Sequence, residues 1–205
     1  KSVEEIYKLN NFIQSYEGKF CFIGIPEQSS YLRDKYPYYC RNKEEYLNNN
    51  ELTMFHGLSK KNVNYINMHD IYRRDKQDDY YFKTDHHFTL RGAYRAYIEI
   101  INRIIEEEKH EIIEPPLKER DMEFVVLPNP ILGSRNRKLS YVYRTDEKIE
   151  IAYPMKKIPY EKITNGYPDP DFYHISEDSS VRPDYGVFMG GDNGETIIRT
   201  HRKEL

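Results

Sequence analysis

The chain has 205 residues and a formal net charge of -3, with charged residues of both signs mixed along its length. A protein that binds nucleic acid needs a basic stripe, so this charge pattern argues against a nucleic-acid partner. Hydrophobic residues make up 38% of the chain, enough for the core of one domain with or without an appendage, and no segment reaches membrane-spanning length.

The first half of the chain alternates between helical and strand patterns. Helices are expected over residues 3–16, 43–56 and 68–74, and strands over residues 20–25 and 63–66. Gly57 is expected to end the second helix. The first strand segment is apolar throughout and stops at Pro26, as buried parallel strands do. This alternation predicts an α/β fold with a mainly parallel sheet.

Two serines follow the first expected strand. Ser29 and Ser30 lie just after the strand ends, at the edge where open α/β sheets place their ligands. Ser29 is therefore a candidate for contact with a substrate. The alternative is that either serine caps a helix.

The two cysteines, Cys21 and Cys40, are too few for a disulfide framework or a zinc cluster. Cys21 lies inside an apolar run, where a buried free thiol is the ordinary expectation. A bridge between Cys21 and Cys40 is the alternative, since spacing alone does not determine disulfide geometry.

A long amphipathic helix is expected to begin at Thr84 or Thr89 and to end in the acidic run 106–108. Beyond Pro115-Pro116 the chain consists of short apolar runs, turn signals and loops rich in proline and glycine. We therefore expect two parts. Residues 1–114 would form the α/β core, and residues 115–205 a β-rich and loop-rich insertion or appendage.

Asp85 and His87, just before the long helix, form the candidate catalytic pair. Side chains two residues apart in an extended or turn segment point the same way, so the carboxylate can hold one imidazole nitrogen while the other faces a substrate. His86 would then point away. One alternative is a metal site on all three residues, suited to iron or manganese. Another is a structural role in which Asp85 caps the helix.

The segment Tyr81-Phe82-Lys83-Thr84-Asp85-His86-His87-Phe88-Thr89, with Gly92-Ala93-Tyr94 and Tyr97 after it, resembles the signature of the DHHW family. That family groups with the alginate O-acetylation proteins in the SGNH-hydrolase-like superfamily. The resemblance covers most of the chain and implies an SGNH-like α/β fold. Phe88 stands where the family has tryptophan, so an aromatic side chain is kept and an indole N–H is lost.

The resemblance also implies a Ser-His-Asp triad, with Asp85 as the residue that orients His87 and His87 as the general base. The serine would come from a later Gly-Asp-Ser turn. The nearest string here, Gly191-Asp192-Asn193, has asparagine at the serine position. The expected serine therefore lies beyond Leu205, in a chain truncated before that strand. A degenerate, non-catalytic relative is the alternative.

A basic segment from Gly133 to Lys138 is a further candidate for substrate contact. Arg135 and Arg137 are candidates to hold an anionic substrate group such as a uronate or a phosphate. An ordinary exposed loop is the alternative.

These observations lead to one principal hypothesis: an O-acyltransferase or esterase that acts on a cell-surface polysaccharide. It requires no cofactor and no metal. Its partners would be a glycan and an acyl-donor partner at the membrane, and self-association through an exposed sheet edge is expected. From the resemblance, the location is extracytoplasmic, with an anchoring segment outside this chain. A non-catalytic module that binds carbohydrate or serves assembly is the alternative.

Overall fold

The computed structural model describes residues 1–41, 45–108 and 114–200, of which Cys40, residues 45–48 and Glu108 are described by their backbone alone. The chain forms two compact units, Lys1–Asp78 and Asp79–Leu205. None of the described helices is both long enough and apolar enough to cross a membrane.

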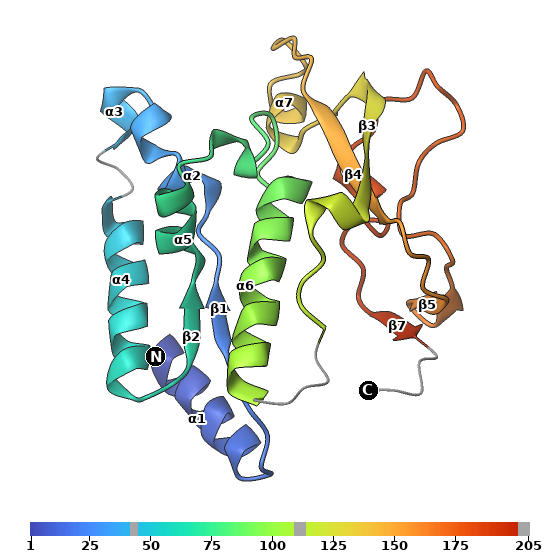
Figure 1. The fold of residues 1–205 in the computed structure, drawn as a ribbon. Helices are drawn as coiled ribbons and strands as arrows, with labels where there is room; N and C mark the ends of the chain where they lie inside the picture. The colour runs from blue at the N-terminus through green and yellow to red at the C-terminus, as the bar shows by residue number, and fades with distance from the viewer. Residues whose placement is uncertain (42–44, 109–113, 201–205) are drawn as a thin grey trace. The chain divides into compact units, whose positions relative to one another are not determined.

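The first unit is built on a pair of parallel strands with helices packed against it (Figure 1). Its elements are α1 (Ser2–Gln14), β1 (Phe22–Gly24), α2 (Gln28–Tyr31), the 3-10 helix η1 (Arg33–Lys35), α3 (Tyr38–Arg41), α4 (Glu45–Lys60), β2 (Tyr65–Asn67) and α5 (Met68–Asp75). Phe55, Leu58 and Val63 form its buried core, against which side chains of α1 and both strands pack. The predicted strand–helix alternation is confirmed here.

Two details of the first unit correct the sequence predictions. Gly57 does not end its helix, because α4 continues to Lys60. A Cβ at Gly57 would come 2.9 Å from a methyl group of Val3, so the glycine lets α1 and α4 pack closely. The residue before α2 is Glu27, so Ser29 lies inside that short helix and does not cap it.

The second unit is mainly β and carries the Asp-x-His motif. Its elements are η3 (Asp78–Tyr80), α6 (Leu90–Glu108), η4 (Glu119–Asp121), β3 (Met122–Pro130), α7 (Ser134–Lys138), β4 (Lys148–Pro154), β5 (Tyr160–Thr164), β6 (Tyr167–Pro168), η5 (Tyr185–Val187) and β7 (Thr196–Thr200). β3 pairs with β4, and β5 pairs with both β6 and β7, all antiparallel. The expected turn at Asn165-Gly166 is present, with both residues at positive φ as a tight hairpin requires.

One hydrophobic core holds the second unit together. Phe82, which precedes the motif, packs there with side chains of β3, β4 and η5. The members that are most buried are Phe82, Leu127, Ile131, Ile149, Ile151 and Val187. The loop that carries Asp85 is therefore anchored in the same core as the strands.

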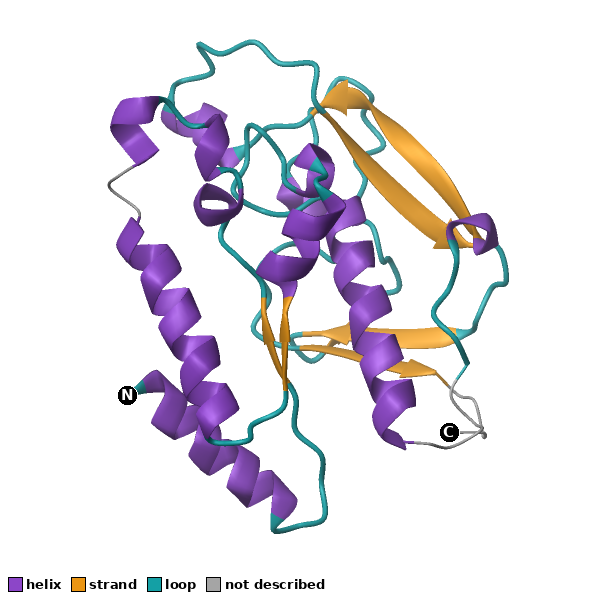
Figure 2. Cartoon of the chain, turned by 60° about the vertical axis from the view of Figure 1, so that its left-hand side comes forward, coloured by secondary structure: helices purple, strands orange, loops and turns teal. Residues whose placement is uncertain are grey.

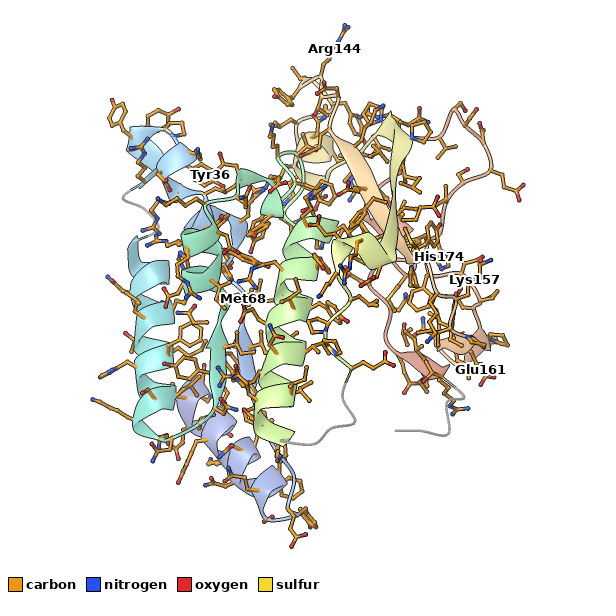
Figure 3. All side chains as sticks on the ribbon, viewed as in Figure 1. Tyr36, Met68, Arg144, Lys157, Glu161 and His174 are labelled. Atoms are coloured by element: carbon orange, nitrogen blue, oxygen red, sulfur yellow. The ribbon has the colours of Figure 1, made fainter. Side chains whose placement is uncertain are left out.

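The three-stranded sheet also encloses an ammonium group. The Lys162 side chain is fully buried, and its Nζ donates to Asp169 Oδ2 at 2.7 Å and to the Asp171 carbonyl. His174, labelled in Figure 3, lies 3.4 Å away. The hydrogen bond from Lys162 lowers the pKa of Asp169 to about 2. Such a buried charge requires this complete set of partners.

The fold is mixed α/β, as predicted, but the mainly parallel sheet is not confirmed. Among the described strands only β1 and β2 pair in parallel, and the sheets are small and separate (Figure 2).

The predicted division at residues 114 and 115 places α6 with the first part, whereas α6 lies within the second compact unit. The assignment of residues 115–205 as an insertion or appendage remains a prediction. The bridge between Cys21 and Cys40 depends on a side chain, that of Cys40, which lies outside the described part.

Candidate functional site

The Asp-x-His motif lies on a tight loop that leads into α6. The backbone N–H of Thr89 donates to the Tyr80 carbonyl at 2.9 Å, and that of Phe82 to the His87 carbonyl at 3.2 Å, which closes the loop like a hairpin. The Thr89 hydroxyl oxygen accepts the N–H of Gly92 at 3.4 Å, in the manner of a helix cap. Thr89 therefore precedes the long helix, and Asp85 does not cap it.

Asp85 and His87 face one another within this loop. His87 Nδ1 lies 2.5 Å from Asp85 Oδ1, and the His87 backbone N–H donates to the same oxygen at 3.1 Å. Asp85 is 1% exposed, while the His87 side chain is 24% exposed. The carboxylate is thus enclosed, and the imidazole that it holds reaches the surface.

Hydrogen bonding keeps Asp85 ionised in this buried position. Burial by itself would raise the pKa of the carboxyl. The backbone N–H groups of Ser134 and His87, and then the His87 imidazole, outweigh it and lower the pKa to about 2. At neutral pH the carboxylate only accepts hydrogen bonds, so the proton between the two side chains lies on His87 Nδ1. In the neutral form of the imidazole, the lone pair is then on Nε2.

A second carboxylate, that of Glu147, holds the loop through hydrogen bonds to the residues just before Asp85. Its two oxygens accept the backbone N–H of Lys83 at 2.6 Å, and the backbone N–H and hydroxyl of Thr84 at 3.0 and 2.7 Å. Three hydrogen bonds to one carboxylate hold the residues just before Asp85 in place. The sequence offered no signal for this role, because Glu147 is more than 60 residues away in an ordinary charged segment.

The start of α7 closes the site on the other side. The N–H of Ser134 donates to Asp85 Oδ2 at 2.6 Å, and the N–H of Arg135 to the Thr84 carbonyl at 3.1 Å. A Cβ at Gly133 would lie 2.1 Å from that same carbonyl oxygen. Only glycine allows the backbone to come so near, and this approach brings the Ser134 N–H to Asp85.

His86 does not point away, contrary to the sequence prediction. Its Nδ1 lies 3.4 Å from Asp85 Oδ1 and 2.8 Å from the Ser134 hydroxyl. Its ring centroid is 3.8 Å from that of His87. The tight loop folds the three side chains toward one another, whereas the prediction assumed the alternation of an extended strand.

Tyr185 covers the His87 imidazole. The two rings are stacked, with centroids 3.6 Å apart and planes 7° from parallel. Two rings cannot share one face of an imidazole at these distances, so His86 and Tyr185 cover opposite faces. Burial, followed by the charges of Asp192 and Asp85, raises the pKa of the Tyr185 hydroxyl. Tyr185 is one of 20 tyrosines, and no pattern in the sequence distinguishes it from the others.

We expect Tyr185→Ala to lower the kcat of any reaction that uses His87 by up to about tenfold, because a stacked ring pair contributes about 0.5–1.5 kcal/mol to ring placement. Tyr185→Phe keeps the ring, so its kcat should stay within about twofold of that of the wild type. Steady-state kinetics of both variants measures the difference. Equal losses in the two variants would show that the hydroxyl, and not the stacked ring, matters.

The same three side chains meet the simplest requirement of a metal site. The potential ligand atoms of Asp85, His86 and His87 all lie within 4.8 Å of one another. Two histidines and a carboxylate are a ligand set used for non-haem iron. However, Asp85 Oδ1 accepts the Nδ1–H of His87, so a metal ion bound to these atoms would have to replace that hydrogen bond.

The residues predicted to contact substrate belong to two different units of the chain. Ser29 is in the first unit, where its hydroxyl lies 3.4 Å from Glu27 Oε2. Arg135 and Arg137 are on α7, a short helix where the sequence suggested a loop. Arg137 is exposed and lies 3.8 Å from Asp184 Oδ2. Their roles remain predictions.

The described residues include no serine hydroxyl bonded to His87. The hydroxyl of Ser134 bonds to His86 instead. Asn193, at the position where a Gly-Asp-Ser turn would have serine, donates its side-chain amide to the Met189 carbonyl at 2.7 Å. Its role in the structure is to close a turn at the residues of positive φ, Gly190 and Gly191.

Comparison with known proteins agrees with the resemblance of the motif. The family model described as DHHW protein matches residues 5–202. Comparison with curated proteins finds no match. Bacillus cereus PatB1 with a sulfonyl adduct is a similar structure, with a TM-score of 0.71 and 20% identity over 98% of this chain and 67% of that one. A DHHW family protein from Eubacterium siraeum DSM 15702 has a TM-score of 0.63 and 18% identity over 98% of this chain and 65% of that one.

The chain thus spans about two thirds of the length of each of these structures. At such identities the structural likeness concerns the fold alone. The family match extends over nearly the whole chain and includes both units. The chain therefore belongs to the DHHW family.

Proposed function

We propose that the second unit supports acyl transfer or ester hydrolysis, with His87 as general base and Asp85 as the residue that orients it. The observation that carries this proposal is the 2.5 Å hydrogen bond from His87 Nδ1 to an enclosed, ionised carboxylate. This bond keeps the tautomer in which Nε2 has the lone pair. It also stabilises the imidazolium that forms when Nε2 takes a proton.

The chemistry follows from this arrangement. His87 Nε2 removes the proton of a serine hydroxyl as that oxygen attacks an acyl carbonyl, and returns it to the leaving group. In the second half of the reaction Nε2 removes a proton from the hydroxyl of a sugar or from water as that oxygen attacks the acyl-serine. The bond between the acyl group and the serine oxygen then breaks, and Nε2 returns the proton to that oxygen. The serine is proposed to come from outside residues 1–205.

Two comparisons support the proposal. Membership of the DHHW family agrees with an SGNH-like relationship. One similar structure is PatB1 with a sulfonyl adduct. Sulfonyl groups react with nucleophiles that a neighbouring base has activated, which is the chemistry that Asp85 and His87 would support here.

We further propose a polysaccharide acceptor outside the cytoplasm and an acyl-donor partner at the membrane. Ser29, Arg135 and Arg137 remain proposed substrate contacts. Self-association through a sheet edge remains a proposal as well. The alternative function is a carbohydrate-binding or assembly module that keeps this fold without turnover.

The test is turnover of a chromogenic acetyl ester by the intact protein, with and without an oligosaccharide acceptor. We expect ester cleavage that continues after treatment with EDTA, together with acetylated oligosaccharide detected by mass spectrometry. Loss of turnover with EDTA, restored by iron or manganese, would favour the metal site. Binding of the oligosaccharide without any turnover would favour the module.

A further inference from the structure

The first unit contains a pocket of about 1020 Å³ at one end of α5, bordered by η1, α3 and α4. This is at the upper end of the size of ligand pockets. All of its lining residues belong to the first unit, whereas Asp85 and His87 belong to the second. Its lining is unusually rich in charged side chains.

Among the described residues, five cations and two carboxylates line the pocket. The cations are Arg33, Lys35, Arg41, Arg73 and Lys76, and the carboxylates are Asp34 and Asp78. The chain as a whole carries a net charge of -3, so this positive excess is local. A hollow lined by one sign of charge concentrates the field and attracts counter-ions.

Neutral groups hold one of these cations in place. Arg41 Nε donates to the carbonyl of Tyr36, labelled in Figure 3, at 2.7 Å, and Arg41 Nη2 donates to the Asp34 carbonyl at 2.8 Å. Both acceptors are backbone oxygens, which orient the guanidinium, and no carboxylate among the described side chains is paired with it. A guanidinium fixed in this way loses little entropy when it binds an anion.

Two more cations reach the pocket from α5. Arg73 and Lys76 are exposed and have no carboxylate partner among the described residues. Lys76 follows the helix in the left-handed conformation, with φ of 54°, and its backbone N–H donates to the Tyr72 carbonyl. By contrast, Lys35 is paired with Asp78 at 2.8 Å. Within the described part of the chain, Arg41, Arg73 and Lys76 are therefore the cations of the pocket that carry positive charge without a carboxylate partner.

We propose that this pocket binds a small polyvalent anion, a ligand of sugar size with two or more carboxylate or phosphate groups. Several separate cations suit a ligand with several anionic groups better than a ligand with a single anionic group. A nucleic acid would need a basic surface that continues beyond the pocket, and the acidic balance of the whole chain disfavours it. The proposal concerns binding alone and is independent of the roles of Asp85 and His87.

Isothermal titration calorimetry on the intact protein tests this inference with named probes. Trigalacturonate presents carboxylates, fructose 1,6-bisphosphate presents phosphates, and maltotriose is the neutral control. We expect one or both anions to bind, with an affinity that weakens as salt is added, and maltotriose not to bind. Whichever anion binds more tightly identifies the preferred group.

The double variant Arg73→Gln/Lys76→Gln should weaken the binding of the anion at least tenfold. Arg74→Gln is the matched control, because Arg74 is the neighbouring exposed residue on α5 and does not line the pocket. The affinity of Arg74→Gln for the anion should stay within about twofold of that of the wild type. Circular dichroism verifies that both variants are folded. The proposal would be overturned if the two variants had equal affinities for the anion, or if neither anion bound to the protein. It would also be overturned if maltotriose bound, or if a twelve-residue oligothymidylate bound more tightly than the small anions.

Discussion

Replacing His87 with alanine is expected to reduce turnover of an acetyl ester by the intact protein to background. Asp85→Asn should lower kcat about 10⁴-fold, the loss known when the residue that orients a catalytic histidine becomes an amide. Asparagine offers an N–H₂ group where the carboxylate accepts three N–H groups, two from His87 and one from Ser134. The imidazole would then lose the tautomer with its lone pair on Nε2.

The matched controls are His56→Ala and Asp79→Asn. His56 is exposed on α4 in the first unit, and Asp79 is exposed in η3. Neither should change kcat by more than about twofold. Turnover that survives in His87→Ala would contradict the assignment of the base, whatever the controls show.

Asp85→Asn should also change how stability depends on pH. The pKa of Asp85 is lowered in the folded protein, so its contribution is fully present above the unfolded pKa of about 4 and is lost as the pH falls through about 2. A decrease from 3.8 to about 2 corresponds to about 2 kcal/mol. Urea unfolding between pH 5 and pH 2 should show a smaller loss of stability in Asp85→Asn than in the wild type. Parallel curves would mean that the carboxylate is not held as the structure indicates.

Replacing Gly133 with alanine is the second change with a large expected effect. The new methyl group would lie 2.1 Å from the Thr84 carbonyl oxygen, far inside contact distance. Gly133 has an ordinary φ of -64°, so the cost arises from this contact and not from an unfavourable backbone conformation. The backbone must separate, which breaks the hydrogen bonds from Ser134 to Asp85 and from Arg135 to Thr84.

We expect Gly133→Ala to lower the free energy of unfolding by about 3 kcal/mol, at the upper end of overpacking costs, and to reduce kcat even where the protein remains folded. Urea titration and steady-state kinetics measure the two effects. Gly194→Ala is the control, because its methyl group would find the side-chain oxygen of Asn165 at 3.2 Å as its nearest neighbour. Its cost should stay below about 1 kcal/mol. A similar cost for both variants would refute the role of the close approach at Gly133.

The sequence predicted those parts of the molecule that depend on neighbouring residues. The parallel strands and their helices follow from apolar runs and helical spacing, and the hairpin turn follows from Asn165-Gly166. The close pairing of Asp85 and His87 follows from their separation by one residue. The Asp-x-His motif and the DHHW family could also be identified from the sequence, because the residues of the motif are consecutive in the chain.

The surroundings of that motif depend on tertiary structure. Glu147, Ser134 and Tyr185 reach the loop from segments that lie about 50 to 100 residues further along the chain. No local pattern distinguishes these three from other glutamates, serines and tyrosines, since their roles arise only from the folding of the strands around one core.

The sequence alone therefore determined that an ionisable pair precedes a long helix in a DHHW family chain. Only the tertiary structure decided that the carboxylate of this pair is enclosed and ionised, and that His86 turns inward. The physical reason is that the hydrogen bond from Ser134 and the burial of Asp85 are supplied by residues distant in the sequence. The separation of Asp85 from His87 is local, whereas the state of the carboxylate is not.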